Sequence, residues 1–289
     1  MTTRYGGHMI ATTAEPLTEM AQRIRHHIIE LATNSPGAHV GGSMSVTEIL
    51  TVLFFDDVLK VNPAEPHWAE RDRLIYSKGH SSAALYAVLA ERGFFPVSEL
   101  ASYKQPGSRL AGHPSRDIPG VEWATGSLGH GLPVAVGMSL ANRHDHRDSR
   151  TFVVLGDGEC QEGSIWEAAM SAAHFRLDNL VVIVDRNGFQ EDGATEDIMA
   201  LEPLADKWRS FGWQVVEVDG HDVTQLSQAL HRVPLASGQP SCVIARTEKG
   251  HGLSFTSNTH TWHYGKFSQQ QYQQALQEMS GKPVVGLLP

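Results

Sequence analysis

The segment that decides the fold begins with Thr151-Phe-Val-Val-Leu-Gly-Asp-Gly-Glu159 and ends with Leu180-Val-Val-Ile-Val-Asp-Arg-Asn187. Each of these two stretches opens on an unbroken run of β-branched and other apolar residues, which is typical of strands buried on both faces of a parallel sheet. Residues 164–175 between them predict a helix, so the segment predicts a strand–helix–strand crossover. Ligands of such α/β proteins bind beyond the carboxyl ends of the strands, where polar residues stand here.

Strands and helices alternate along the rest of the chain. Apolar spacing and turn residues predict helices at 17–32, 45–59, 83–92, 131–142, 223–235 and 269–279, and further strands at 213–218 and 242–246. The helix at 45–59 is expected to begin with a capping box formed by Ser45 and Glu48. The alternation predicts one α/β domain with a doubly wound, mostly parallel sheet and helices on both faces. We assign residues 17–289 to this domain and 1–16 to a flexible N-terminal segment.

The composition argues against several classes of function. The chain of 289 residues carries a formal net charge of −9, which disfavours a surface for nucleic acids or anionic membranes. Two cysteines, Cys160 and Cys242, are too few for a disulfide framework. We find no signal-peptide pattern and no run of about 18 apolar residues. We therefore expect a cytoplasmic protein with neither a nucleic-acid nor a membrane partner.

The turn after the first buried strand predicts a metal-bridged diphosphate site. Its glycines allow phosphate oxygens to approach the backbone, and the following helix N-terminus favours negative charge. Asp157 in the same turn would repel a bare diphosphate, whereas a divalent cation with oxygen ligands would bridge the two groups. Asn187, at the end of the neighbouring strand, offers an amide oxygen to the same ion. The GxGxxG turn of a dinucleotide site and the GK[ST] of a Walker loop are both absent from this segment.

Several other glycine-rich motifs accompany this segment. They are Gly37-Ala-His-Val-Gly-Gly-Ser43, Ser77-Lys-Gly-His80, Gly112-His-Pro114, Gly126-Ser-Leu-Gly129 and His263. Together with the runs at 156–174 and 185–192, this ordered set resembles the thiamine diphosphate enzymes, and within them the transketolases, from about residue 36 to residue 265. The resemblance implies the thiamine diphosphate-binding fold, specifically its diphosphate-binding domain. It also implies transfer of a two-carbon ketol group from a ketose (phosphate) donor to an aldose (phosphate) acceptor.

The resemblance also assigns roles to individual residues. Mg²⁺, with Ca²⁺ or Mn²⁺ as substitutes, would be bound by the side chains of Asp157 and Asn187 and by the backbone carbonyl of Phe189. Contacts to thiamine diphosphate would come from His80, Gly126, Leu128, Gly156, Gly158, Glu159, Glu162, Asn187 and His263. Catalytic roles around the cofactor's reactive carbon would fall to His39, His80, His113 and His263. Imidazole suits such proton transfers near neutral pH.

Some readings of these residues compete with the roles above. A zinc site built from the four histidines is disfavoured, because their spacing follows no compact ligand pattern. Glu162 is additionally expected at a subunit interface. Cys160 lies near a predicted helix N-terminus that would lower its pKa, yet a structural role is favoured over a nucleophilic one. Ser127, His130 and Arg186 depart from the family's common pattern. His130 either changes the polarity around the substrate or faces the adjacent helix.

The resemblance further implies that the active site is shared between two chains. Complete transketolases carry a further domain that binds the aminopyrimidine and supplies a catalytic Glu, and the sequence ends at Pro289 without one. We therefore expect the N-terminal subunit of a split transketolase, active only with a C-terminal partner subunit, two copies of each forming the complex. The alternatives are a subunit of a deoxyxylulose phosphate synthase-like or 2-oxoacid dehydrogenase-like enzyme, or a noncatalytic assembly subunit.

Overall fold

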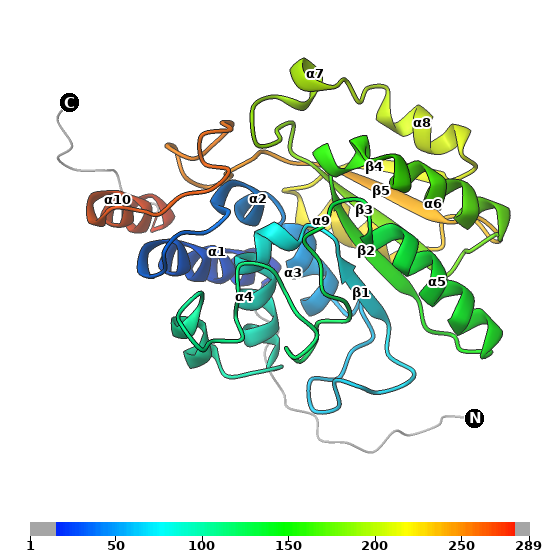
Figure 1. The fold of residues 1–289 in the computed structure, drawn as a ribbon, viewed down its shortest axis with the longest axis horizontal. Coiled ribbons are helices and arrows are strands. Elements are labelled where there is room, and N and C mark those ends of the chain that lie inside the picture. Colours follow the sequence, from blue (N-terminus) through cyan, green and yellow to red (C-terminus); the bar gives the residue numbers. More distant parts are fainter. Residues whose placement is uncertain (1–15, 281–289) are drawn as a thin grey trace.

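A single five-stranded sheet forms the centre of the molecule (Figure 1). The computed structural model describes residues 16–280, so the predicted flexible segment lies almost wholly outside the described residues, as do residues 281–289. The strand order is β1-β2-β3-β5-β4, and every neighbouring pair is parallel. The strands are β1 (Arg73–Tyr76), β2 (Thr151–Gly156), β3 (Leu180–Arg186), β4 (Gln214–Asp219) and β5 (Ser241–Arg246). The prediction of a parallel, doubly wound α/β fold is confirmed.

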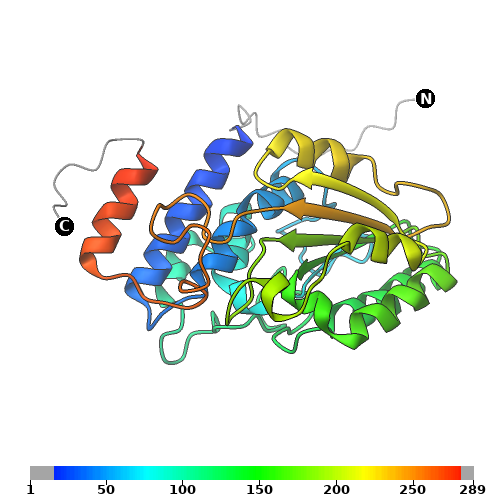
Figure 2. The same cartoon turned by 90° about the horizontal axis from the view of Figure 1, so that it is seen from above.

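Helices cover both faces of this sheet (Figure 2). They are α1 (Leu17–Asn34), α2 (Val40–Ser45), α3 (Thr47–Phe55), α4 (Ser82–Arg92), α5 (Gly131–His144), α6 (Gly163–His174), α7 (Thr195–Ile198), α8 (Leu204–Ser210), α9 (Val223–His231) and α10 (Gln269–Met279). Alternate residues of each strand enter two separate cores because successive side chains point to opposite faces. Val154 and Ile183 join the core with α1, α3, α4 and α9. Val153 and Val182 join the core with α5, α6 and α8.

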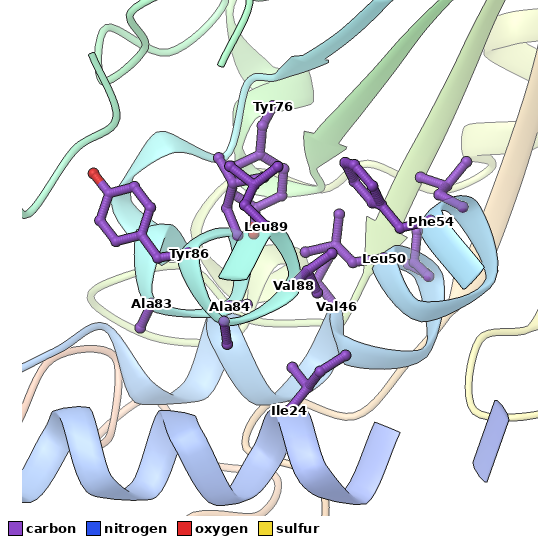
Figure 3. Packing of buried hydrophobic residues seen from close by; sticks show 14 of the residues in the cluster. Ile24, Val46, Leu50, Phe54, Tyr76, Ala83, Ala84, Tyr86, Val88 and Leu89 are labelled. Atoms are coloured by element: carbon purple, nitrogen blue, oxygen red, sulfur yellow. The ribbon is translucent and has the colours of Figure 1, made fainter. Parts of the chain in front are cut away.

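The larger core holds the amino-terminal helices against the sheet. Ile24 of α1, Leu50 of α3 and Val88 of α4 are fully buried there (Figure 3). This packing fixes the position of α2 and of the loops that connect these helices to the carboxyl edge of the sheet. Within the described residues, no helix is both long and apolar enough to span a membrane.

The prediction of a helix at 45–59 is wrong at the N-terminal end of that helix. α2 ends at Ser45 and α3 begins at Thr47, and the expected capping box is absent. Instead, the Ser45 hydroxyl donates to Asp185 in β3 at 2.7 Å, and the Glu48 carboxylate accepts from Arg25 at 2.6 Å. Both side chains are buried, so these tertiary partners satisfy them better than a local cap would.

Several other boundaries also differ from the predictions. The helix expected at 223–235 ends at His231, and α1 extends to Asn34. β1 was not predicted, since its four residues Arg73-Leu-Ile-Tyr76 are too few to show a pattern. The short helices α2, α7 and α8 were also missed. The sheet is entirely parallel in the described residues, where a mostly parallel one was expected.

Two glycines of α5 provide a matched test of how closely α5 packs against Ser77. A Cβ at Gly131 would lie 2.2 Å from the Ser77 Oγ and 2.6 Å from its Cβ, whereas a Cβ at Gly137 would meet nothing within 4 Å. We expect Gly131→Ala to lower the free energy of unfolding by roughly 1–3 kcal/mol through overpacking. Gly137→Ala should raise it by about 0.5–1 kcal/mol through helix propensity. Urea denaturation measures both, and equal responses would contradict the observed approach of α5 to Ser77.

Candidate functional site

A cavity of about 410 Å³ opens at the carboxyl ends of β2 and β3. This volume is in the range of cofactor and ligand sites. All site residues predicted from the sequence line this one cavity, although they come from distant parts of the chain: His39, His80, His113, Gly126, Leu128, Gly156, Asp157, Gly158, Glu159, Glu162, Asn187, Phe189 and His263. The parallel sheet brings them together because all its strands end at one edge.

Asp157 is the buried carboxylate at the centre of this edge. Its Oδ1 accepts from the Gly158 N–H at 2.8 Å, and its Oδ2 accepts from the Gly188 N–H at 2.6 Å and from Arg186 at 2.9 Å. Burial raises the pKa of Asp157, and the charge of Arg186 opposes that rise. A buried carboxylate of this kind favours a cation beside it.

The residues around Asp157 fit a hard divalent cation. Asn187 lies at the end of β3, and its Oδ1 accepts from the Phe189 N–H at 3.1 Å. Among the described residues, the Phe189 carbonyl accepts no hydrogen bond. A carboxylate, an amide oxygen and a free carbonyl therefore line one cavity, a donor set that Mg²⁺ and Ca²⁺ prefer.

Arg186 connects this edge to the segment after β3. Its guanidinium donates to Asp157, to the Thr195 hydroxyl at 2.6 Å and to Glu196 at 2.6 Å, and the side chain is buried. These bonds engage Oδ2 of Asp157 and hold its carboxylate in one orientation. Arg186, which departs from the family's common pattern, thus has a structural role. Its position in the sequence did not indicate this role.

Two buried lysines near Asp157 were not assigned from the sequence. Lys78 forms a buried ion pair with Asp185 and donates to the Gly42 carbonyl at 3.2 Å. Lys249 donates to the Gln190 carbonyl at 2.9 Å, and burial lowers its pKa to about 8. Both ammonium groups line the cavity. Lys78 belongs to the Ser-Lys-Gly-His motif, which could have pointed to it. For Lys249, the sequence shows only a lysine before a glycine shortly after β5.

Four histidine rings form a cluster in the cavity lining, with His39 in the middle. Its ring centroid lies 5.2 Å from that of His80, 5.3 Å from that of His263 and 6.2 Å from that of His113. Burial lowers the pKa of His39 to about 4 and that of His263 to about 3. Burial also lowers the pKa of His80 and of His113. At neutral pH the rings are therefore uncharged, with one donor and one acceptor nitrogen each. The acceptor nitrogen of His263, its Nδ1, already accepts from Lys249 at 3.0 Å.

The histidines form no metal site. Among the described residues, only Glu48, His221 and His251 bring three potential ligand atoms within 4.8 Å of one another. Both nitrogens of His221 are already engaged, by Glu48 at 3.0 Å and by the Glu248 N–H at 2.8 Å. The zinc alternative finds no support in this geometry.

The loop at 126–129 is held against the sheet by Glu159. This buried carboxylate accepts from the Gly129 N–H at 2.9 Å, from the Gly156 N–H at 3.2 Å and from the Ser77 hydroxyl. The oxygens of Glu159 thus bind protein groups, and its predicted contact with a cofactor stays a prediction. Glu162, at the exposed start of α6, lines the cavity mouth.

Two further residues complete the comparison with the sequence. Cys160 is fully buried, and burial raises the pKa of its thiol well above the usual value. The expectation of a lowered thiol pKa is therefore wrong, whereas the favoured structural role agrees with this burial. His130 is exposed and lies within 3.2 Å of the Ser127 hydroxyl, outside the cavity lining.

The lowered histidine pKa values predict a pH-dependent stability. In the unfolded chain the imidazole pKa returns to about 6.5, so the unfolded state takes up protons first on acidification. The lowered pKa of the folded state therefore contributes to the free energy of unfolding. For His39 this contribution is complete above about pH 6.5 and is lost as pH falls towards the folded pKa of about 4. We expect His39→Asn to reduce the loss of unfolding free energy between pH 7 and pH 5.

In His39→Asn, the loss of unfolding free energy between pH 7 and pH 5 should be smaller than in the wild type by on the order of 1 kcal/mol, allowing for the partial exposure of the His39 ring. Urea denaturation at both pH values measures it. His144→Asn is the control, because it removes an exposed imidazole on α5. Its pH dependence should match that of the wild type. An unchanged pH dependence in His39→Asn would contradict the prediction.

Known proteins share this chain's sequence and fold. Residues 17–284 match the family model described as the transketolase, thiamine diphosphate binding domain. The chain is 40% identical over 266 residues to an apulose-4-phosphate transketolase subunit of Phocaeicola vulgatus, covering 92% of this chain and 94% of that protein. It is 42% identical over 264 residues to the 6-deoxy-6-sulfo-D-fructose transketolase subunit SqwG of Clostridium sp., covering 91% of this chain and 96% of that protein.

A solved transketolase from Leishmania mexicana superposes with a TM-score of 0.86 at 31% identity. The superposition covers 93% of this chain and 42% of the Leishmania chain. The chain thus spans less than half of this structural relative and nearly the full length of the two bacterial subunits.

Proposed function

Because the chain belongs to the family of transketolase thiamine diphosphate-binding domains, we propose that it is the N-terminal subunit of a split transketolase. Its reaction is the transfer of a two-carbon ketol group from a ketose to an aldose. The names of two full-length relatives, each a transketolase subunit, support this assignment. We keep the cytoplasm as the expected compartment on the sequence grounds given above.

One observation carries the proposal: a single cavity is lined both by a set of oxygen ligands and by a histidine cluster. Asp157, Asn187 and the Phe189 carbonyl would hold Mg²⁺, and Lys249 would face the cofactor's diphosphate. Charge-assisted bonds to phosphate oxygens are stronger than neutral ones. Gly126, Leu128, Gly156 and Gly158 would contact the cofactor through backbone and small apolar groups.

The histidine cluster would bind the substrate. Thiamine diphosphate, when bound, supplies the nucleophilic carbon that adds to the ketose carbonyl. His39, His80, His113 and His263 are uncharged near pH 7 because of their burial. They would orient the sugar hydroxyls through hydrogen bonds and accept or return protons at those oxygens. Their partial burial would strengthen these bonds.

The second wall of the site would come from another polypeptide. Both bacterial relatives are named as subunits, and Glu162, Glu191 and Asp192 are exposed at the cavity mouth. We propose a C-terminal partner subunit that supplies the pyrimidine-binding domain and its catalytic Glu, two copies of each chain forming the complex. Sugars or sugar phosphates would be the substrates.

Reconstitution tests this division of labour. We expect the purified chain to show no ketol transfer by itself, and full activity to return when it is mixed with the product of a neighbouring gene that encodes the pyrimidine-binding half. A coupled assay with xylulose phosphate and an aldose acceptor measures the rate. Full-rate transfer by the isolated chain would overturn the proposal of a split enzyme.

Two variants separate cofactor binding from turnover. Asp157→Ala removes a metal ligand, and we expect Mg²⁺-dependent retention of thiamine diphosphate by the reconstituted pair to fall by about 100-fold or more. His263→Ala should retain the cofactor and lower kcat by about 100-fold. Equilibrium dialysis and the coupled assay measure the two effects. Asp197→Ala, at an exposed carboxylate of α7, is the control, and retained Mg²⁺-dependent affinity in Asp157→Ala would contradict the metal assignment.

A further inference from the structure

Lys249 and His263 form a hydrogen-bonded pair in the cavity lining. The Lys249 ammonium donates to the His263 Nδ1 at 3.0 Å and to the Gln190 carbonyl at 2.9 Å. Lys249 is only 2% exposed, and both residues of the pair line the cavity. The two bonds use two of the three ammonium protons and run to different segments of the chain, so the ammonium group is held in one orientation.

The backbone around the pair brings the two residues together. The Gly250 N–H donates to the Gly41 carbonyl at 3.0 Å, and the Gly41 N–H donates to the Trp262 carbonyl at 2.9 Å. Gly41 thus connects the residue after Lys249 to the residue before His263. A Cβ at Gly41 would lie 2.8 Å from the Lys249 Cγ and 3.1 Å from the Trp262 carbonyl oxygen, so a side chain at this position would push the pair apart.

The pair leaves one tautomer for His263. An ammonium group has hydrogen-bond donors and no acceptor, so the ring nitrogen that faces it carries no proton. Lys249 is mostly protonated at pH 7, since burial lowers its pKa only to about 8. The His263 ring is uncharged at this pH, because burial lowers its pKa to about 3. An uncharged ring carries one proton, which must then lie on Nε2.

The Nε2–H of His263 is available to a ligand. Among residues 16–280, the only hydrogen bond of this ring is the one from Lys249 to Nδ1. The ring stacks on His80 with centroids 5.4 Å apart and lies edge-on to His39 at 89°. An Nε2–H donates to oxygen atoms, and the ring has no second free nitrogen with which to take up a proton. His263 can therefore stabilise negative charge on an oxygen without serving as a general base.

We propose that Lys249 is a positioning residue that holds His263 in the Nε2–H tautomer, so that His263 presents the substrate with a hydrogen-bond donor and no proton acceptor. The inference rests on the proposed function for the identity of the ligand, a sugar whose oxygen gains negative charge during ketol transfer. It narrows that function, because proton uptake then falls to His39, His80 and His113. Lys249 thus acts through His263 in addition to facing the diphosphate.

The tautomer is measured by ¹⁵N NMR of the full chain labelled at histidine, at pH 7. The two ring nitrogens give separate signals, and their chemical shifts show which one carries the proton. His263→Gln identifies the His263 signals by removing them from the spectrum. We expect the wild-type chain to carry the His263 proton on Nε2. A proton found on Nδ1 would overturn the inference, whatever the variants show.

Variants of Lys249 test whether this lysine sets the tautomer. Lys249→Met keeps the length of the side chain and removes the donor, so the ratio of Nε2–H to Nδ1–H should fall by about tenfold or more, as for the loss of a hydrogen bond from a charged group. Lys249→Arg keeps a charged donor and should restore the wild-type ratio. Lys266→Met, at an exposed lysine three residues after His263, is the control, and circular dichroism checks that each variant is folded. An unchanged ratio in Lys249→Met, or an equal change in Lys266→Met, would overturn the inference.

Turnover of the reconstituted pair tests the role of the donor. His263→Gln keeps an N–H donor on a group that takes up no proton near pH 7, whereas His263→Ala removes the donor. At saturating cofactor, we expect kcat of His263→Gln to stay within about tenfold of the wild type and that of His263→Ala to fall by about 100-fold. Equal losses in the two variants would contradict the donor role. Absence of ketol transfer by the wild-type pair would instead refute the proposed function, and the NMR result on the chain alone would stand.

Discussion

The buried carboxylate of Asp185 is the group on which the arrangement of the site depends. It lies inside β3 and is neutralised by Lys78, which follows β1, while the hydroxyls of Ser45 and Thr247 donate to the same carboxylate. Burying a charge is costly unless it is paired and fully hydrogen-bonded, so these four side chains constrain one another. Ser45 also accepts from the amide of Asn187 at 3.3 Å. The same network therefore sets the position of an expected metal ligand.

The parts of the fold that rest on local patterns were predictable from the sequence. β2 and β3 each contain an unbroken apolar run, and the topology of parallel sheets then places Asp157 and Asn187 at one edge. The break between α2 and α3 was not predictable, because Ser45 is engaged by Asp185 at a sequence separation of 140 residues. Propensity and capping rules carry no information about such a partner.

The same limit applies to the candidate site. Motifs marked the histidines and the expected metal ligands, and the structure collects them in one cavity. Lys78, Lys249 and the Arg186 bridge to Asp157 were missed, because a lone lysine or arginine in a sequence is most often a solvated surface residue. Only burial and hydrogen-bond partners distinguish them, and both are properties of the folded chain.

The cavity wall is assembled from segments spread between His39 and His263. Its formation therefore requires contacts of high sequence separation, which are associated with slow folding. A ligand held by such a wall binds no partly folded form, so its binding free energy adds to the global stability of the chain by linkage. Cofactor supply would then influence how long this protein survives proteolysis in a cell as well as how fast it works.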